Sequence, residues 1–172
     1  MELLKLMKKR RSIRSYTGEA LTEENLNQIL AAGLLSPSGH NTKPWEFLVV
    51  RNKELLEKMT KCREGAANML KGADTAIVVL ADPTKTDVWT EDCSIAMEHM
   101  HLMADSMGIG SCWIQGRLRK AATGQTTEEY LREVLGFSEN LRLEAVLSLG
   151  MPAVKPEPHT MDSLLWDRIH RM

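Results

Sequence analysis

The sequence has no long hydrophobic run: nowhere do roughly 18 apolar residues follow one another, the length that a membrane-spanning helix needs. Residues 1–5 contain no apolar core followed by a small-residue cleavage site, so no secretory signal is expected there. Together these absences predict a cytoplasmic protein that does not insert into a membrane.

Cysteine is scarce. The three cysteines, Cys62, Cys93 and Cys112, are an odd number, and no two of them form a Cys-x-x-Cys pair. This pattern favours free, reduced thiols over a disulfide framework, which also agrees with a cytoplasmic protein.

Neither sign of charge dominates, because the formal net charge at pH 7 is -1. A dedicated nucleic-acid-binding protein is normally strongly basic, so that function is disfavoured. No Gly-x-Gly-x-x-Gly motif follows a predicted strand, which argues against a separate dinucleotide-binding domain. His99 and His101 are two residues apart on a predicted helix and face roughly opposite ways, so we predict no metal site.

Residues 1–172 are expected to form one domain, since no repeat, low-complexity stretch or linker marks a boundary. Hydrophobic periodicity and capping residues predict its elements. The predicted helices are residues 2–10, 22–36, 53–62, 89–107 and 127–135; the predicted strands are 46–50, 75–81 and 141–149, with 111–114 beginning a further strand or loop. Such an irregular alternation of helices and strands indicates an α+β fold rather than a doubly wound sheet.

Two segments carry more apolar surface than a small domain needs. The helix at 89–107 is apolar around much of its circumference, which places it in the core or against a partner chain. The tail, residues 153–172, is first rich in proline and then amphipathic around Leu164, Leu165, Trp166 and Ile169. We expect this tail to wrap a second subunit.

An arginine-rich segment follows the first helix. Arg10, Ser12 and Arg14 occupy alternate positions, so in an extended chain they point the same way. Guanidinium groups present a planar fork of donors that matches phosphate, which predicts an anion site. A basic, solvated helix end is the alternative that the sequence leaves open.

A loop of small and polar residues, 36–45, leads into the first strand. It contains Pro37, Ser38, Gly39 and Asn41, whose polar groups suit the edge of a planar heterocycle. A simple helix-to-strand connector has the same composition, so this alternative also stays open.

Four ordered motifs, read together, resemble the FMN-dependent nitroreductase family over essentially the whole chain. They are Arg-Arg-Ser-x-Arg at 10–14, Pro-Ser-x-x-Asn-x-x-Pro-Trp at 37–45, the long helix that ends in Gly-Ile-Gly-Ser-Cys-Trp at 108–113, and Gly-x-Pro at 150–152. The resemblance implies a nitroreductase-like α+β fold, with a central mixed or antiparallel sheet flanked by helices. It also implies an intertwined homodimer with FMN at the subunit interface.

The resemblance assigns three groups of residues to FMN. The phosphate and ribityl chain would be held by Arg10, Arg11, Ser12 and Arg14. The flavin ring would be approached from the other subunit by Pro37, Ser38, Gly39 and Asn41. A loop along the isoalloxazine, with a backbone N–H near flavin N5, would be formed by Trp113, Ile114, Gln115 and Gly116. Asn68 is a further candidate, and so is one of Lys155, His159 and Arg168 for the phosphate. Roles for Lys43 and Cys112 stay open.

The resemblance further implies that NAD(P)H passes a hydride to flavin N5 and that a small acceptor then takes its place, in a ping-pong mechanism. The acceptor could be a nitroaromatic, a quinone, an enone or another flavin. No side chain is assigned as catalytic, because the cofactor carries the chemistry. The alternatives are an FMN-storing or FMN-sensing protein without efficient turnover, and a protein that contacts nucleic acid through residues 8–14.

Overall fold

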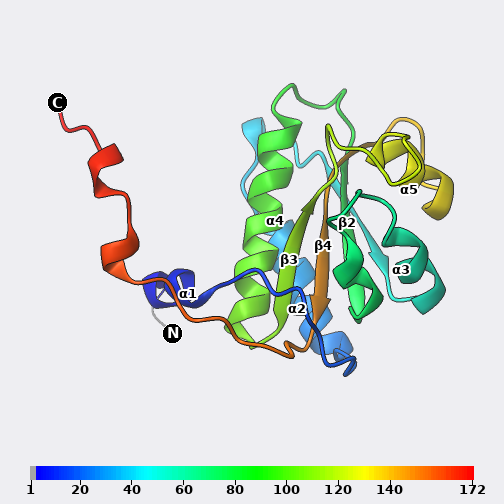
Figure 1. Cartoon of the computed structure of the whole chain (residues 1–172). Coiled ribbons are helices and arrows are strands. Elements are labelled where there is room, and N and C mark those ends of the chain that lie inside the picture. The colour runs from blue at the N-terminus through cyan, green and yellow to red at the C-terminus, as the bar shows by residue number, and fades with distance from the viewer. Residues whose placement is uncertain (1–2) are drawn as a thin grey trace.

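A computed structural model describes residues 3–172 and shows a four-stranded sheet between two layers of helices (Figure 1). The strands are β1 (Trp45–Val50), β2 (Thr75–Ala81), β3 (Gly110–Gln115) and β4 (Arg142–Gly150). Their order is β1-β2-β4-β3, and each neighbouring pair is antiparallel. The helices are α1 (Leu3–Lys9), α2 (Glu23–Leu34), α3 (Lys53–Met59), α4 (Trp89–Ser106) and α5 (Thr127–Leu135). The expected α+β fold is confirmed, with an antiparallel sheet.

The predicted elements agree closely with the observed ones. Thr22 caps α2, where its side chain accepts from the Asn25 N–H at 3.1 Å. The predicted start of the first helix at residue 2 lies outside the described residues. The short 3-10 helix η2 (Asn68–Lys71) was not predicted, because a single turn has no hydrophobic period to recognise.

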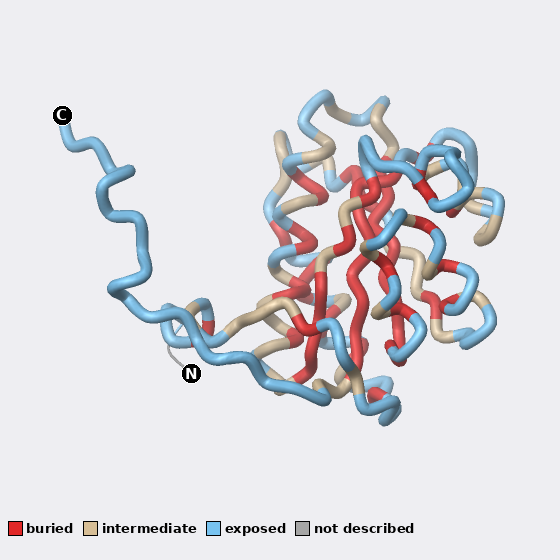
Figure 2. The backbone as a smooth tube through the Cα atoms, viewed as in Figure 1, coloured by how far each residue is buried: buried red, intermediate tan, exposed pale blue. Residues whose placement is uncertain are grey.

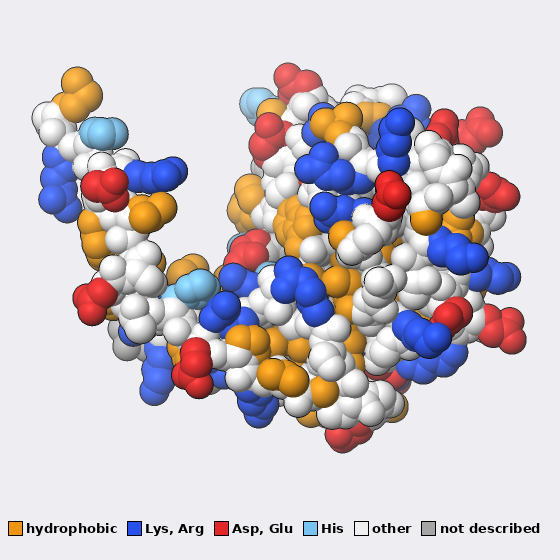
Figure 3. All heavy atoms as spheres, in the orientation of Figure 1, with side chains coloured by type: hydrophobic (Ala, Val, Ile, Leu, Met, Phe, Trp, Pro, Cys, Tyr) orange, Lys and Arg blue, Asp and Glu red, His pale blue; other side chains and the backbone are white. Residues whose placement is uncertain are grey.

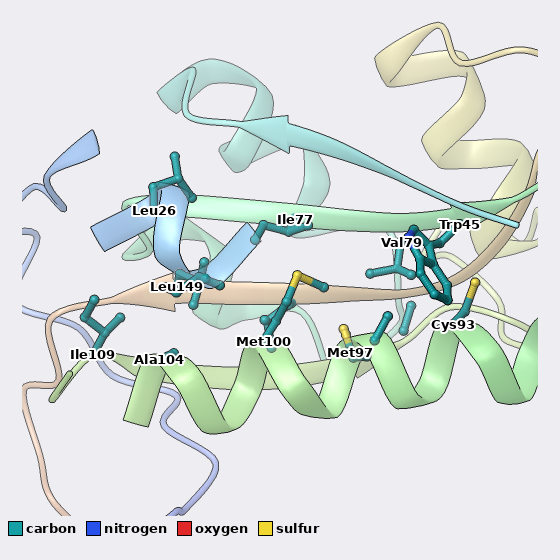
Figure 4. Close-up of a cluster of buried hydrophobic side chains, with 14 of the residues drawn as sticks. Leu26, Trp45, Ile77, Val79, Cys93, Met97, Met100, Ala104, Ile109 and Leu149 are labelled. Carbon is teal, nitrogen blue, oxygen red and sulfur yellow. The ribbon is translucent and has the colours of Figure 1, made fainter. Parts of the chain in front are cut away.

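Alternation along the strands builds two cores, one on each face of the sheet. Figure 2 shows that the buried backbone runs through the middle of the sheet. Ile77 and Val79 of β2 face α2 and α4, whereas Val78 and Leu80 face α3, α5 and η2. Figure 4 shows Met97, Met100 and Ala104 of α4 directed at the strands. The long helix is therefore central to the core. Within residues 3–172 no helix is long and apolar enough to cross a membrane.

A β-bulge in β4 shapes the end of β3. The β2–β4 register shifts between Val79 and Leu80, which leaves Glu144 as the extra residue. The Glu144 carbonyl accepts the N–H groups of Gly116 at 3.1 Å and Arg117 at 2.9 Å. These bonds fix the turn that follows β3.

The arginine-rich segment lies along the outer edge of β3. Ser12 forms a parallel bridge with Ser111, and the Ile13 N–H donates to the Ser111 carbonyl at 2.9 Å. Tyr16 secures the other end of the segment: its hydroxyl donates to the Ile13 carbonyl at 2.8 Å and lies 2.7 Å from the Ser148 hydroxyl. The segment is thus extended and tied to the sheet.

The tail after Ala153 leaves the body of the protein (Figure 1), and all of its residues are exposed (Figure 2). Its apolar side chains have no core to join: Leu165 is 61% exposed, Trp166 55% and Ile169 52%.

We predict that Tyr16→Phe lowers the free energy of unfolding by about 1–2 kcal/mol, because it removes bonds to a buried serine and to the arginine segment. Tyr130→Phe is the matched control, since its hydroxyl bonds the Lys58 carbonyl at the surface; it should change stability by less than about 0.5 kcal/mol. Urea denaturation measures both. Equal effects would show that Tyr16 does not hold the segment.

Candidate functional site

A cavity of about 400 Å³ lies where the arginine segment, the turn before η2 and β3 meet. Three separate parts of the chain build it. Its lining residues are Arg14, Arg63, Gly65, Ala66, Asn68, Met69, Cys112 and Trp113. The structure therefore brings the predicted residues Arg14 and Trp113 together, and it adds Asn68, which the sequence left open.

The cavity is positively charged. Within residues 3–172 neither Arg14 nor Arg63 has a carboxylate partner, whereas Arg51, Arg132 and Arg142 pair with acids. Figure 3 shows Lys and Arg side chains on the face that the N-terminal segment crosses. Uncompensated guanidiniums around a cavity favour an anionic ligand.

Cys112 lies among these cations. Burial raises the pKa of its thiol, against the opposing effects of Arg14, Ser12, Arg10 and Arg63. Only 1% of the residue is exposed. The thiol therefore stays protonated and packs as a wall of the cavity.

Arg63 was missed by the sequence reasoning. It is an isolated arginine in a turn, and no motif surrounds it. Arg63 lies in the same cavity as Arg14 only because the tertiary fold brings the two segments together, so no local signal in the sequence could have identified it.

The remaining residues of the arginine segment face other partners. Arg10 Nη1 lies 2.8 Å from His101 Nε2 on α4. Arg11 instead donates to the Glu157 carbonyl of the tail and lines a second, small cavity with Lys155. Opposite orientations of neighbouring residues are what an extended segment produces.

The three tail candidates for a phosphate contact do not line the Arg14 cavity of this chain. Lys155 lies in the small cavity beside Arg11, and the His159 N–H donates to the Lys8 carbonyl at 2.9 Å. Arg168 belongs to the exposed 3-10 helix Trp166–Arg168.

The stretch 113–116, expected to be a loop, is strand as far as Gln115. It pairs with residues 145–147 of β4, and this pairing is the reason that it is regular. Because the Ser111 carbonyl points outward to Ile13, alternation directs the N–H groups of Trp113 and Gln115 outward as well. The edge of β3 therefore presents two outward backbone donors, and Trp113 lines the cavity itself.

Ile114 and Gly116 face inward. The Ile114 side chain is buried in the core, and the Gly116 N–H is used by the Glu144 carbonyl. A Cβ at Gly116 would lie 2.5 Å from Leu143 Cδ2, so the position requires glycine.

A partly buried side-chain network supports the edge of β3. Trp113 Nε1–H donates to Gln115 Oε1 at 2.8 Å, and Gln115 Nε2–H donates to Glu144 Oε1 at 3.3 Å. Burial raises the pKa of Glu144, against the lowering effect of its bond from Gln115. The Glu144 carboxyl thus helps, through Gln115, to hold the Trp113 side chain beside the cavity.

The loop that contains residues 37–41 lies elsewhere, at the start of α4. The Gly39 N–H donates to Asp92 Oδ1 at 2.9 Å, and a Cβ at Gly39 would come within 2.9 Å of Val88. Asp92 and His101, the partner of Arg10, are nine residues apart, or roughly 13 Å along the helix axis. Within one chain the loop and the arginine segment therefore do not meet.

The same loop has an unusual backbone. His40, Asn41 and Lys43 have φ of 51°, 57° and 48°, in the left-handed region that non-glycine residues rarely adopt. The Ser38 hydroxyl accepts the Lys43 N–H at 2.9 Å and stabilises this conformation. Strained, exposed backbone of this kind is common at binding sites.

Comparisons with known proteins agree with this arrangement. A family model described as the nitroreductase family matches residues 7–63 and 59–151. A protein of Archaeoglobus fulgidus, provisionally named NADH dehydrogenase/NAD(P)H nitroreductase, is 40% identical over 175 residues, which cover 99% of this chain and 97% of the relative.

Solved structures give the same result. An FMN-dependent nitroreductase from Clostridium difficile matches with a TM-score of 0.95 and 38% identity, covering 98% of both chains. A provisionally named nitroreductase from Desulfovibrio desulfuricans, solved in complex with FMN, matches with a TM-score of 0.79 and 25% identity over 99% of both chains. Since a family model, a full-length relative and a full-length structure all agree, the chain belongs to the nitroreductase family.

Proposed function

We propose that the chain is an FMN-dependent oxidoreductase that takes reducing equivalents from NAD(P)H and passes them to a small acceptor. The observation that carries this proposal is the cavity in which two guanidiniums without carboxylate partners lie beside Cys112 and Trp113 of β3. The names of the relatives support the same activity.

The residues present fit FMN. Arg14, with Ser12 and Arg10 beside it, offers charge-assisted donors for the phosphate and ribityl chain. Asn68 can donate to and accept from the polar edge of a flavin ring. Arg11, which bonds the tail, would secure the segment rather than touch the cofactor.

The edge of β3 supplies the groups that would face the ring. The outward N–H of Gln115 is the candidate donor to flavin N5, and Trp113 forms the wall beside it. The Glu144 carbonyl holds the following turn, so this donor is fixed in place. When bound, FMN supplies the hydride chemistry by accepting from NAD(P)H and reducing the acceptor.

One cavity would serve both ligands in turn, which predicts ping-pong kinetics. The lining has no acid or base suited to one class of acceptor, so a nitroaromatic, a quinone, an enone and another flavin remain candidates.

We further propose a homodimer in which the loop at Pro37, Ser38, Gly39 and Asn41 of one subunit completes the site of the other. Two surfaces support this. A groove of about 430 Å³ between α1, α2 and α4 is lined mainly by apolar side chains, including Leu35, which is 82% exposed. The tail exposes further apolar residues (Figure 3), and surfaces of this kind are typical of protein interfaces.

Arg14 is the arginine expected to contact the phosphate in the cavity. Arg14→Ala should weaken FMN binding about 10- to 100-fold, because a charge-assisted contact contributes roughly 1.5–3 kcal/mol. Arg142→Ala is the control: it removes the same charge from a half-exposed arginine that does not line the cavity. Titration of the apoprotein with FMN measures both, and equal affinities would contradict the site.

Turnover distinguishes an oxidoreductase from a flavin-storing protein. The purified protein should be yellow, and anaerobic mixing with NADH or NADPH should bleach the flavin absorbance in a stopped-flow experiment. A yellow protein that neither nicotinamide bleaches would favour storage or sensing. A colourless protein that ignores added FMN would refute cofactor binding altogether.

Deletion of residues 153–172 should shift the protein toward monomer in sedimentation velocity, since it removes a large part of the exposed apolar surface. A truncated protein that remains a stable dimer would show that the tail does not wrap the second subunit.

A further inference from the structure

Arg10 is held by a buried histidine. Arg10 Nη1 lies 2.8 Å from His101 Nε2, and His101 Nδ1 is hydrogen-bonded to the Ser111 hydroxyl. His101 is 3% exposed and Ser111 is 2% exposed. The three residues come from three different elements: the arginine segment, α4 and β3.

The hydrogen bonds determine the protonation of His101. A guanidinium can only donate, so Nε2 must be an unprotonated acceptor. The ring proton then lies on Nδ1 and is donated to the Ser111 hydroxyl oxygen. A protonated imidazolium would place a second cation against Arg10 and would leave the guanidinium without its acceptor.

The surroundings of His101 favour the neutral ring. Burial, followed by the charge of Arg10, lowers its pKa to about 4. Two acids of α4 lie near this group: Asp105 pairs with Lys9 at 3.4 Å, and burial raises the pKa of Glu98 against the lowering effect of the Arg10 charge. No carboxylate is bonded to His101 within residues 3–172.

We propose that His101 is a positioning residue, which as the Nδ1–H tautomer orients the Arg10 guanidinium toward the phosphate of the bound flavin nucleotide. This inference rests on the proposed function. Ser111 contributes twice, since its hydroxyl oxygen accepts the His101 Nδ1–H of this tautomer and its carbonyl accepts the Ile13 N–H. The same serine thus sets both the path of the arginine segment and the direction of its first arginine.

A positioning role makes a specific prediction about ligands. FMN and riboflavin share the ring and the ribityl chain and differ only in the phosphate. A residue that orients Arg10 toward phosphate should affect FMN and spare riboflavin, whereas a merely structural residue should affect both equally.

The experiment compares the two ligands in titrations of the apoprotein. His101→Leu, which removes the acceptor, should weaken FMN binding on the order of tenfold and leave riboflavin binding unchanged. His101→Gln should keep most of the FMN affinity, because an amide oxygen can accept from Arg10 and an amide N–H can donate to Ser111. His99→Leu is the matched control on the same helix: His99 bonds the Ser36 hydroxyl at 2.8 Å, and its loss should not change the ratio of the two affinities.

Two further measurements make the result decisive. In an Arg10→Ala background, His101→Leu should have no additional effect on FMN binding, because its partner is already absent. Nitrogen-15 NMR of the apoprotein should show Nδ1 protonated and Nε2 unprotonated in His101 at neutral pH.

Equal losses for FMN and riboflavin, an unchanged FMN affinity, or a protonated Nε2 would each overturn the inference while leaving the proposed function intact. A wild-type protein that binds neither flavin would overturn both.

Discussion

The hydrogen bond from the Ile13 N–H to the Ser111 carbonyl, 2.9 Å long, is the contact on which the candidate site depends. It adds the arginine segment to the outer edge of β3, and with the neighbouring Ser12–Ser111 bridge it keeps that segment extended. In an extended segment Arg10 and Arg14 lie on the side opposite Arg11. Without this pairing Arg14 would not lie beside Cys112 and Trp113, and Arg10 would not reach His101.

Much of this arrangement could be predicted from the sequence. The Thr22 cap, the continuous apolar run of β2 and the helical spacing along α4 are local signals, and the structure confirms the elements that they indicate. Other features arise only when distant segments meet. Arg63 lies at the cavity because of the tertiary fold. The bulge at Glu144 depends on the register between β2 and β4, which cannot be predicted from either strand alone. The sequence left residues 111–114 open between strand and loop, and the resemblance implied a loop at 113–116; pairing with β4 makes the chain strand as far as Gln115.

The geometry of α4 explains why one subunit is insufficient in this account. The helix separates the loop at Asp92 from the arginine segment at His101, and it forms part of the core in between. Neither end can move toward the other without disrupting close-packed side chains. The exposed groove beside α4 and the exposed tail then supply the surface through which a second copy could bring its loop to the cavity.

A mixed dimer tests this shared site most directly. Subunits that carry Arg14→Ala are combined with subunits that carry Asn41→Ala, and FMN binding to the purified heterodimer is titrated. If each site combines the arginine segment of one subunit with the loop of the other, one site carries both substitutions and the second carries none. The heterodimer should then bind one FMN with wild-type affinity. Two weakened sites, and no site of wild-type affinity, would contradict the account.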